Sequence, residues 1–162
     1  MKRTTAREIA VRLCFAISEN PAENIEKLLE QTFEKDYYST LQEEDELYSS
    51  RPNKKQLDYI KDLVTGISEH SAELDGYIDE YSVGWKFGRI SRTATAIMKL
   101  AMYEVLYMPD IPNGAAINEA VELAKRYEEP QTVSFINGIL GSFSRNELGG
   151  FETGDGSVSR RV

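Results

Sequence analysis

The chain has 162 residues, of which 41% are hydrophobic and 28% are charged, and its formal net charge is −8. This length fits one compact domain, or two small subdomains that share a core, and the composition is ordinary for a soluble globular protein. We find no apolar run near the roughly 18 residues of a membrane span and no secretory signal at the start. The single cysteine, Cys14, excludes an internal disulfide. We therefore expect a cytoplasmic protein with no membrane partner.

The negative charge is concentrated in one segment. Ten acidic residues and two lysines lie between Glu19 and Glu46, a local charge equal to that of the whole chain. The first twelve residues, in contrast, contain four cations and one carboxylate. Salt screens charges that lie more than about 8–10 Å apart, so a small basic end can act beside a distant acidic one. The net charge alone therefore excludes no class of partner.

Helical patterns begin at the start of the chain. Thr5-Ala6-Arg7-Glu8 fits a capping box, and the apolar spacing after it predicts a first helix from about Ala6 to Glu19. A second apolar stripe runs from Ile25 to Phe33. The acidic segment from Asp36 to Pro52 has no clear period, so it is predicted to be a loop or a frayed helix.

The longest pattern lies in the middle of the chain. Apolar residues recur in steps of three and four from Leu57 to Tyr81, which predicts a single helix of about 28 residues, roughly 42 Å long. Such a helix is too long for one small bundle, so we expect it to be shared by two subdomains. Trp85 and Phe87 follow in the next connection, where we expect them to plug the core.

Three further helices are predicted in the second half. Ser91 is expected to cap the first of them, Asn113 the second and Thr132 the last. No segment alternates apolar and polar residues for long enough to form a strand, so the fold is predicted to be all-α. We expect residues 1–147 to form the helical domain. The Gly- and Ser-rich residues 148–162 are expected to form a disordered tail.

The sequence offers little for catalysis. His70 is the single histidine, and no second histidine or cysteine is present to share a metal ion with it or with Cys14. The common nucleotide-binding, hydrolase and metalloprotease motifs do not occur. The many carboxylates are better explained as a solvated face than as a paired acid and base. We therefore predict no enzyme, no catalytic residue, no metal ion and no cofactor.

Two features point instead to nucleic acid. Arg3 and Arg7 are four residues apart and so share one helix face, where guanidinium groups can bind phosphates. A solvated helix start is the alternative explanation. Near the end of the chain, Gln131 to Phe135 surround the start of a predicted helix. Phe135 lies beside the apolar stripe, where it can either pack in the core or stack on a base of single-stranded RNA.

Five segments of the chain are distinctive in sequence and order: "TAREIAVRLCFAI", "YIKDLVTGISEHSAELDGYI", "IMKLAMYEV", and "IPNGAAINEAVELAKRY" followed by "VSFINGIL". In these segments the chain resembles the NusB family of bacterial antitermination factors. The resemblance extends from about Lys2 to Arg145. It implies two three-helix subdomains that share a long helix. It also implies a non-catalytic protein that binds the single-stranded boxA element of ribosomal RNA leaders. The expected partners are the ribosomal protein known as NusE and the antitermination complex of RNA polymerase.

The resemblance also implies roles for particular residues. The RNA-binding residues it implies, with phosphates at the basic positions and bases at the others, are Lys2, Arg3, Arg7, Gln131, Ser134 and Phe135. The residues it places at the ribosomal-protein interface are Phe15, Ala94 and Met98. Two positions depart from the family pattern. Ser134 stands where a basic residue is frequent, and Ala94 stands where a charged residue is common. The RNA site is therefore expected to be less basic than in relatives.

Other functions stay open on the sequence. The acidic segment suits a helical interaction module that docks a basic protein and never contacts RNA. A similar helical domain precedes some RNA methyltransferases, although 162 residues leave no room for their nucleotide-binding sheet. A homodimer formed through exposed helix faces is also possible.

Overall fold

The computed structural model describes residues 1–84 and 90–148. The expectations for Trp85, Phe87 and all but the first residue of the tail lie outside these ranges. Within them, every regular element is helical, with eight α-helices and one short 3-10 helix. The prediction of an all-α fold is confirmed. The chain divides after Ser68 into two compact units, each of which has its own core.

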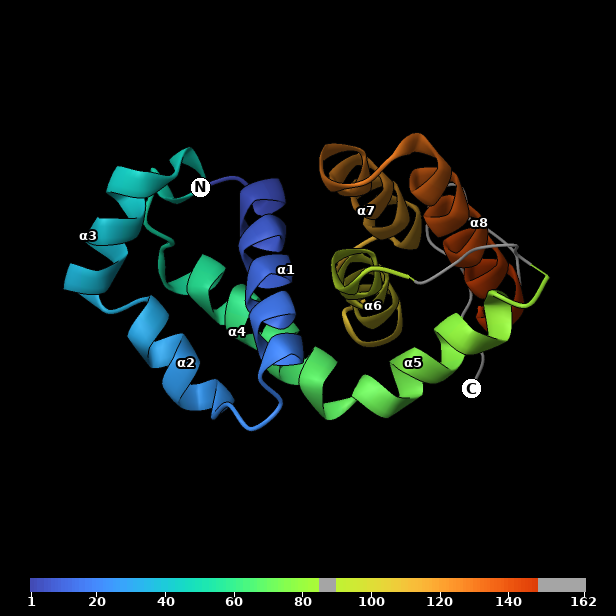
Figure 1. Cartoon of the computed structure of the whole chain (residues 1–162), viewed down its shortest axis with the longest axis horizontal. Coiled ribbons are helices and arrows are strands. Elements are labelled where there is room, and N and C mark those ends of the chain that lie inside the picture. The colour runs from blue at the N-terminus through green and yellow to red at the C-terminus, as the bar shows by residue number, and fades with distance from the viewer. Residues whose placement is uncertain (85–89, 149–162) are drawn as a thin grey trace. The chain divides into compact units, whose positions relative to one another are not determined.

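The first unit contains helices α1 to α4 (Figure 1). Their bounds are α1 Arg3–Glu19, α2 Ile25–Thr32, α3 Lys35–Glu44, the 3-10 helix η1 Glu46–Tyr48, and α4 Lys54–Glu69. The core of this unit is built mainly by α1 and α4. Ile9 on α1 and Ile60 and Leu63 on α4 are at most 1% exposed. Burial of one such side chain stabilises the fold by about 1.5–3 kcal/mol.

The second unit contains helices α5 to α8 (Figure 1). Their bounds are α5 Ser71–Tyr81, α6 Arg92–Tyr107, α7 Asn113–Tyr127 and α8 Pro130–Glu147. Helix α6 packs against each of the other three. It is buried for most of its length, from Ala94 to Val105. The oxygen of Ser91 accepts a hydrogen bond from the backbone N–H of Ala94 at 3.0 Å, which confirms Ser91 as the cap of this helix.

The single long helix expected in the middle of the chain is divided at His70. This residue has φ −100° and ψ 17°, and it separates α4 from α5. Its ring stacks on that of Tyr107, with centroids 4.2 Å apart. The phenol of Tyr107 donates in turn to the carboxylate of Glu73, at 2.7 and 3.0 Å from its two oxygens. The apolar spacing continues across the break because each helix buries the same pattern in its own unit, so periodicity could not reveal the break.

The acidic segment predicted to be a loop or a frayed helix contains helix α3. Glu34 caps this helix by accepting hydrogen bonds from the backbone N–H groups of Asp36 and Tyr37, and these bonds lower the pKa of its carboxyl. Tyr38 anchors the helix in the core. Its side chain is fully buried, stacks on Phe33 and donates to the carbonyl of Ser50 at 2.8 Å. One buried tyrosine thus fixes a helix whose other residues are mostly exposed.

Two helix starts also differ from the prediction. Helix α1 begins at Arg3 with Lys2 as N-cap, and no side chain among the described residues caps it. Thr5 therefore lies inside the helix, and the capping box is wrong. Helix α8 begins at Pro130 rather than after Thr132, because proline suits the first helical position and Glu129 is the N-cap. Asn113 is likewise the first residue of α7 rather than its cap.

Candidate nucleic-acid interface

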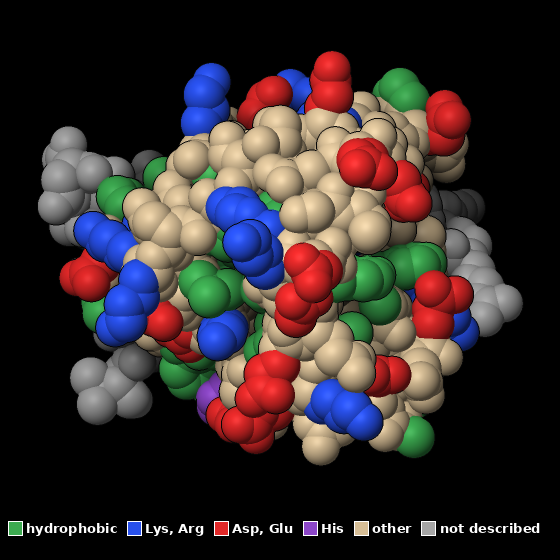
Figure 2. All heavy atoms as spheres, turned by 90° about the vertical axis from the view of Figure 1, so that its left-hand side faces the viewer, with side chains coloured by type: hydrophobic (Ala, Val, Ile, Leu, Met, Phe, Trp, Pro, Cys, Tyr) green, Lys and Arg blue, Asp and Glu red, His purple; other side chains and the backbone are tan. Residues whose placement is uncertain are grey.

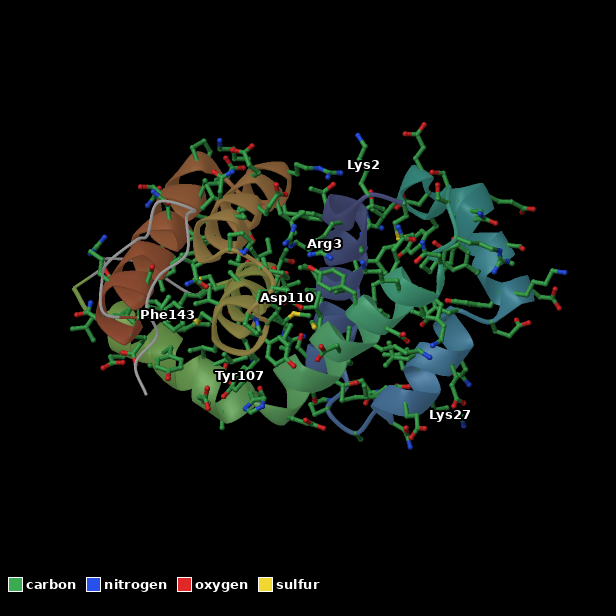
Figure 3. The ribbon with its side chains drawn as sticks, turned by 180° about the vertical axis from the view of Figure 1, so that it is seen from behind. Lys2, Arg3, Lys27, Tyr107, Asp110 and Phe143 are labelled. Atoms are coloured by element: carbon green, nitrogen blue, oxygen red, sulfur yellow. The ribbon has the colours of Figure 1, made fainter. Side chains whose placement is uncertain are left out.

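Lys2 and Arg3 form an exposed basic group at the start of α1. Both side chains are exposed, and they lie at the same end of the helix (Figure 3). Neither forms an ion pair with any residue that the structure describes. A helix N-terminus carries about half a positive charge on its free N–H groups, which adds to the charge of the two side chains. This end of α1 therefore has the chemistry of an anion site.

The side chain of Arg3 rests on α4. Its guanidinium carbon lies 4.8 Å from the centroid of the Tyr59 ring, a cation–π contact. Asn53 and Gln56 cap α4 reciprocally, since each side-chain oxygen accepts from the other residue's backbone N–H at 2.9 Å. The amide of Gln56 also donates to the carbonyl of Met1. These contacts fix the start of α1 against the start of α4.

A cavity of about 220 Å³ lies between these two helix starts. The residues that line it are Arg3, Ala6, Asn53, Lys55, Gln56 and Tyr59. This lining includes two cations, two amides and one aromatic ring, and it contains no carboxylate. In a chain with a net charge of −8 such a lining is unusual, and it favours a negatively charged group.

Arg7 does not share the exposure of Arg3. Its side chain is 6% exposed, so the expectation of an accessible phosphate-binding group at this position is wrong. The two residues do share a helix face. However, all residues from Ala6 to Val11 are buried, so this stretch of α1 leaves no side chain open to solvent.

The start of α8 presents polar groups to solvent. Gln131 and Ser134 are exposed in the first turns of the helix, as the prediction for this segment requires. No described side chain caps these turns, so their backbone N–H groups are open to an acceptor. Glu128 and Glu129 precede the helix, and Glu128 accepts a hydrogen bond from the hydroxyl of Ser91 at 2.5 Å. The segment is therefore polar but not strongly basic.

Phe135 lies in the core and not on the surface. Its side chain is 1% exposed and belongs to the same buried set as Ile136, Ile139, Leu140 and Phe143. The expectation of an open ring for base stacking is wrong for this structure. Of the two alternatives that the sequence left open, core packing is the one observed.

The three residues assigned to the ribosomal-protein interface differ in exposure. Phe15 on α1 is half-buried, so part of its ring is available to a partner. Ala94 and Met98 on α6 are fully buried. A contact between either side chain and a partner is therefore excluded in this conformation. Their one-turn spacing places them on the same side of a helix that is buried nearly throughout.

Acidic side chains dominate the surface of α2, α3 and η1. Most carboxylates between Glu19 and Glu46 are exposed. In Figure 2, acidic and basic side chains are interspersed over the face that the viewer sees.

No group of acidic, histidine or cysteine side chains among the described residues could hold a metal ion. No helix within the described ranges is long and apolar enough to cross a membrane.

Sequence reasoning missed the contribution of α4 to the basic end. Lys55 and Tyr59 are four residues apart and thus share a helix face, and Asn53 with Gln56 fits a helix-capping pattern. These signals were present in the sequence. What the sequence lacks is the pairing of this helix start with that of α1, which only the fold provides.

Comparison with known proteins identifies the family. A profile of the NusB family matches residues 4–145. Transcription antitermination protein NusB of Acetivibrio thermocellus is 38% identical over 160 residues, which are 99% of this chain and 98% of that protein. The protein of the same name from Agathobacter rectalis is 41% identical over 127 residues, which are 75% of this chain and 95% of that protein.

Solved structures agree with this assignment. NusB from T. maritima superimposes with a TM-score of 0.72 at 27% identity, covering 90% of this chain and 92% of that one. The solution structure of NusB from Aquifex aeolicus, with a TM-score of 0.63 at 23% identity, shares the fold over 90% of this chain and 89% of that one. This chain therefore belongs to the NusB family and is a non-catalytic transcription antitermination factor.

Proposed function

We propose that the protein acts in antitermination by binding single-stranded boxA-type leader RNA of ribosomal RNA operons. The observation that carries this proposal is the basic end of the first unit. There, Lys2 and Arg3 are exposed, without carboxylate partners among the described residues, at an uncapped helix N-terminus. Phosphates are the anions that such a group binds best, because guanidinium forks and free backbone N–H groups both donate to them.

The second unit contributes base contacts in this proposal. Gln131 and Ser134 are exposed, and their side chains can both donate and accept hydrogen bonds at base edges. Phe135 is not assigned a stacking role, because it is buried. In this proposal, RNA recognition depends on hydrogen bonds and phosphate contacts, and not on stacking of a base on the ring of Phe135.

The protein partners follow from the family. The proposed complex contains the ribosomal protein known as NusE, with the exposed part of Phe15 at its interface, and it joins RNA polymerase in the cytoplasm. The buried Ala94 and Met98 have no place in this interface. Because the RNA site has few cations, the ribosomal protein is expected to raise RNA affinity by supplying further contacts.

Native gel shifts with boxA-type RNA, with and without the purified ribosomal protein, test this function. The expected result is a shifted band for the chain alone at low salt, and a tighter complex when the ribosomal protein is added. A scrambled RNA of the same length is the control. Failure to shift either RNA, alone or with the ribosomal protein, would refute the proposal.

A second candidate function has one observation in its favour. The exposed carboxylates between Glu19 and Glu46 suit a basic protein partner, so the chain could act as an interaction module without RNA contact. A stable complex with the ribosomal protein that forms equally well with and without RNA, and does not bind RNA, would favour this function.

A homodimer formed through the exposed helix faces is a further alternative. Light scattering at several concentrations would reveal it.

A further inference from the structure

We infer that the cavity between the starts of α1 and α4 binds one nucleotide of the RNA through its phosphate. This inference rests on the function proposed above and adds Asn53, Lys55 and Tyr59 to the RNA-binding surface. It places one phosphate between the side chains of Arg3 on α1 and Lys55 on α4, two helices that are far apart in the sequence.

The charges around the cavity favour a phosphate. Arg3 and Lys55 both line it, and neither forms an ion pair with a described residue. The adjacent Lys54 differs, because it lies 4.0 Å from the carboxylate of Asp58 and does not line the cavity. An ammonium and a guanidinium without carboxylate partners leave an anion as the matching ligand.

The hydrogen-bonding groups of the lining are mostly donors. Gln56 already uses both ends of its amide, accepting from the backbone of Asn53 and donating to the carbonyl of Met1. The oxygen of Asn53 accepts from the backbone N–H of Gln56, so the NH₂ group of the same amide is the part that can donate to a ligand. The cavity therefore offers an amide donor and two cationic donors, and a phosphate supplies only acceptors.

The size of the cavity limits the ligand. Its volume of about 220 Å³ is below the roughly 300–1,000 Å³ of pockets that enclose a drug-sized molecule. It accommodates a phosphate and part of the attached nucleoside. The ring of Tyr59 forms one wall, and Arg3 lies over that ring, so the guanidinium is held at the cavity edge before RNA arrives.

Two neighbouring lysines provide a matched test. Lys55→Gln and Lys54→Gln each remove one positive charge from the same exposed helix turn, and only Lys55 lines the cavity. Lys27→Gln, on α2 and away from Lys2 and Arg3, is the distant control (Figure 3). The affinity of the full chain for boxA-type RNA is measured by fluorescence anisotropy between 0.05 and about 0.3 M salt.

One lost phosphate contact reduces the salt slope by about 0.7, which corresponds to roughly fivefold weaker binding at 0.1 M salt. We expect this loss of affinity for Lys55→Gln. For Lys54→Gln and Lys27→Gln we expect RNA binding to weaken by less than about twofold. Equal losses for Lys55→Gln and Lys54→Gln would overturn the inference while leaving RNA binding intact. Absence of RNA binding by the unmodified chain would instead overturn the proposed function, and the inference with it.

A direct probe uses small ligands. Uridine monophosphate and inorganic phosphate are expected to shift the backbone amide NMR signals of residues 53–59 in the ¹⁵N-labelled chain. Uridine, which has no phosphate, is expected to leave these signals unchanged. Shifts with inorganic phosphate but not with the nucleotide would overturn the assignment to RNA. Shifts confined to other residues would overturn the assignment to this cavity.

Discussion

The guanidinium of Arg3 lies over the ring of Tyr59, 4.8 Å from its centroid, so the first residue of α1 rests on the side of α4. A cation–π contact at an exposed site contributes about 0.5–1 kcal/mol. The same contact also bears on binding, because it holds the guanidinium in place. An arginine that is already held in position loses less side-chain entropy when it binds a phosphate.

This contact predicts that Tyr59→Leu weakens RNA binding about two- to fivefold, the equivalent of a cation–π contact at an exposed site. In the Arg3→Gln background, Tyr59→Leu is expected to have little further effect, because the group that it positions is gone. Anisotropy titrations of both single variants and the double variant measure this coupling. Additive losses would show that Tyr59 does not act through Arg3.

The burial of Phe135 predicts that substitutions there act on stability. Phe135→Ala is expected to lower the free energy of unfolding by about 3–5 kcal/mol, because it leaves a cavity in the core. Phe135→Leu keeps most of the apolar volume, and it is expected to bind RNA within about twofold of the unmodified chain, since no stacking contact is lost. Urea unfolding and anisotropy separate the two effects. A Phe135→Leu protein of normal stability that has lost RNA binding would show that the ring reaches the RNA.

Asp45 predicts an acid-dependent contribution to the stability of the first unit. Its carboxylate accepts from the backbone N–H of Leu47 at 2.9 Å and pairs with Arg12 at 2.7 Å, and these contacts lower the pKa of Asp45. A depressed folded-state pKa gives stability that is present above the ordinary value near 3.9 and is lost as the pH falls below it.

Asp45→Asn is therefore expected to lower the unfolding free energy at pH 7 by less than about 1 kcal/mol, because the ion pair is partly exposed. The difference between the two proteins is expected to shrink as the pH falls below the ordinary pKa of an aspartate. Thermal unfolding at pH 7 and at acidic pH measures it. Glu43→Gln, which removes an exposed carboxylate from the same segment, is the control. A difference that grows on acidification would contradict this assignment.

Tyr107 predicts an alkaline transition in the second unit. Burial and its hydrogen bond to Glu73 raise the pKa of Tyr107 to about 12, above the ordinary value near 10. The neutral phenol is the form that the fold favours, so this stabilisation is fully present below about pH 10 and is lost as the pH rises toward 12.

Ultraviolet titration of tyrosine ionisation tests this assignment. The difference between the unmodified chain and Tyr107→Phe isolates the transition of this phenol, which is expected near pH 12. Glu73→Gln removes the carboxylate and is expected to move the transition to lower pH. If Glu73→Gln leaves the transition unchanged, the carboxylate does not hold the phenol proton.

The fold class could be predicted from the sequence because apolar spacing reports helices directly. Ser91 was recognisable as a cap because its role depends on a residue only three positions away. The sequence left helix α3 undecided between a loop and a frayed helix, because Tyr38 fixes it through contacts with Phe33 and with the distant Ser50. The break at His70 escaped prediction because the apolar period is identical on its two sides.

The candidate site was predicted in part. Exposure of Lys2 and Arg3 followed from their place near a helix start, whereas the burial of Arg7 depends on tertiary packing that the sequence does not show. The same limit applies to Phe135, whose position beside the apolar stripe of α8 was compatible with burial and with exposure. Periodicity states which residues share a face, and packing alone decides which faces are covered.

The most direct test compares the unmodified chain with a Lys2→Gln, Arg3→Gln double variant in binding to boxA-type RNA over a range of salt concentrations. We predict affinity that falls with salt, and a salt slope less steep by about 1.4 in the double variant, since two phosphate contacts are removed. Identical slopes and affinities for the two proteins would contradict the assignment of the RNA site to the start of α1.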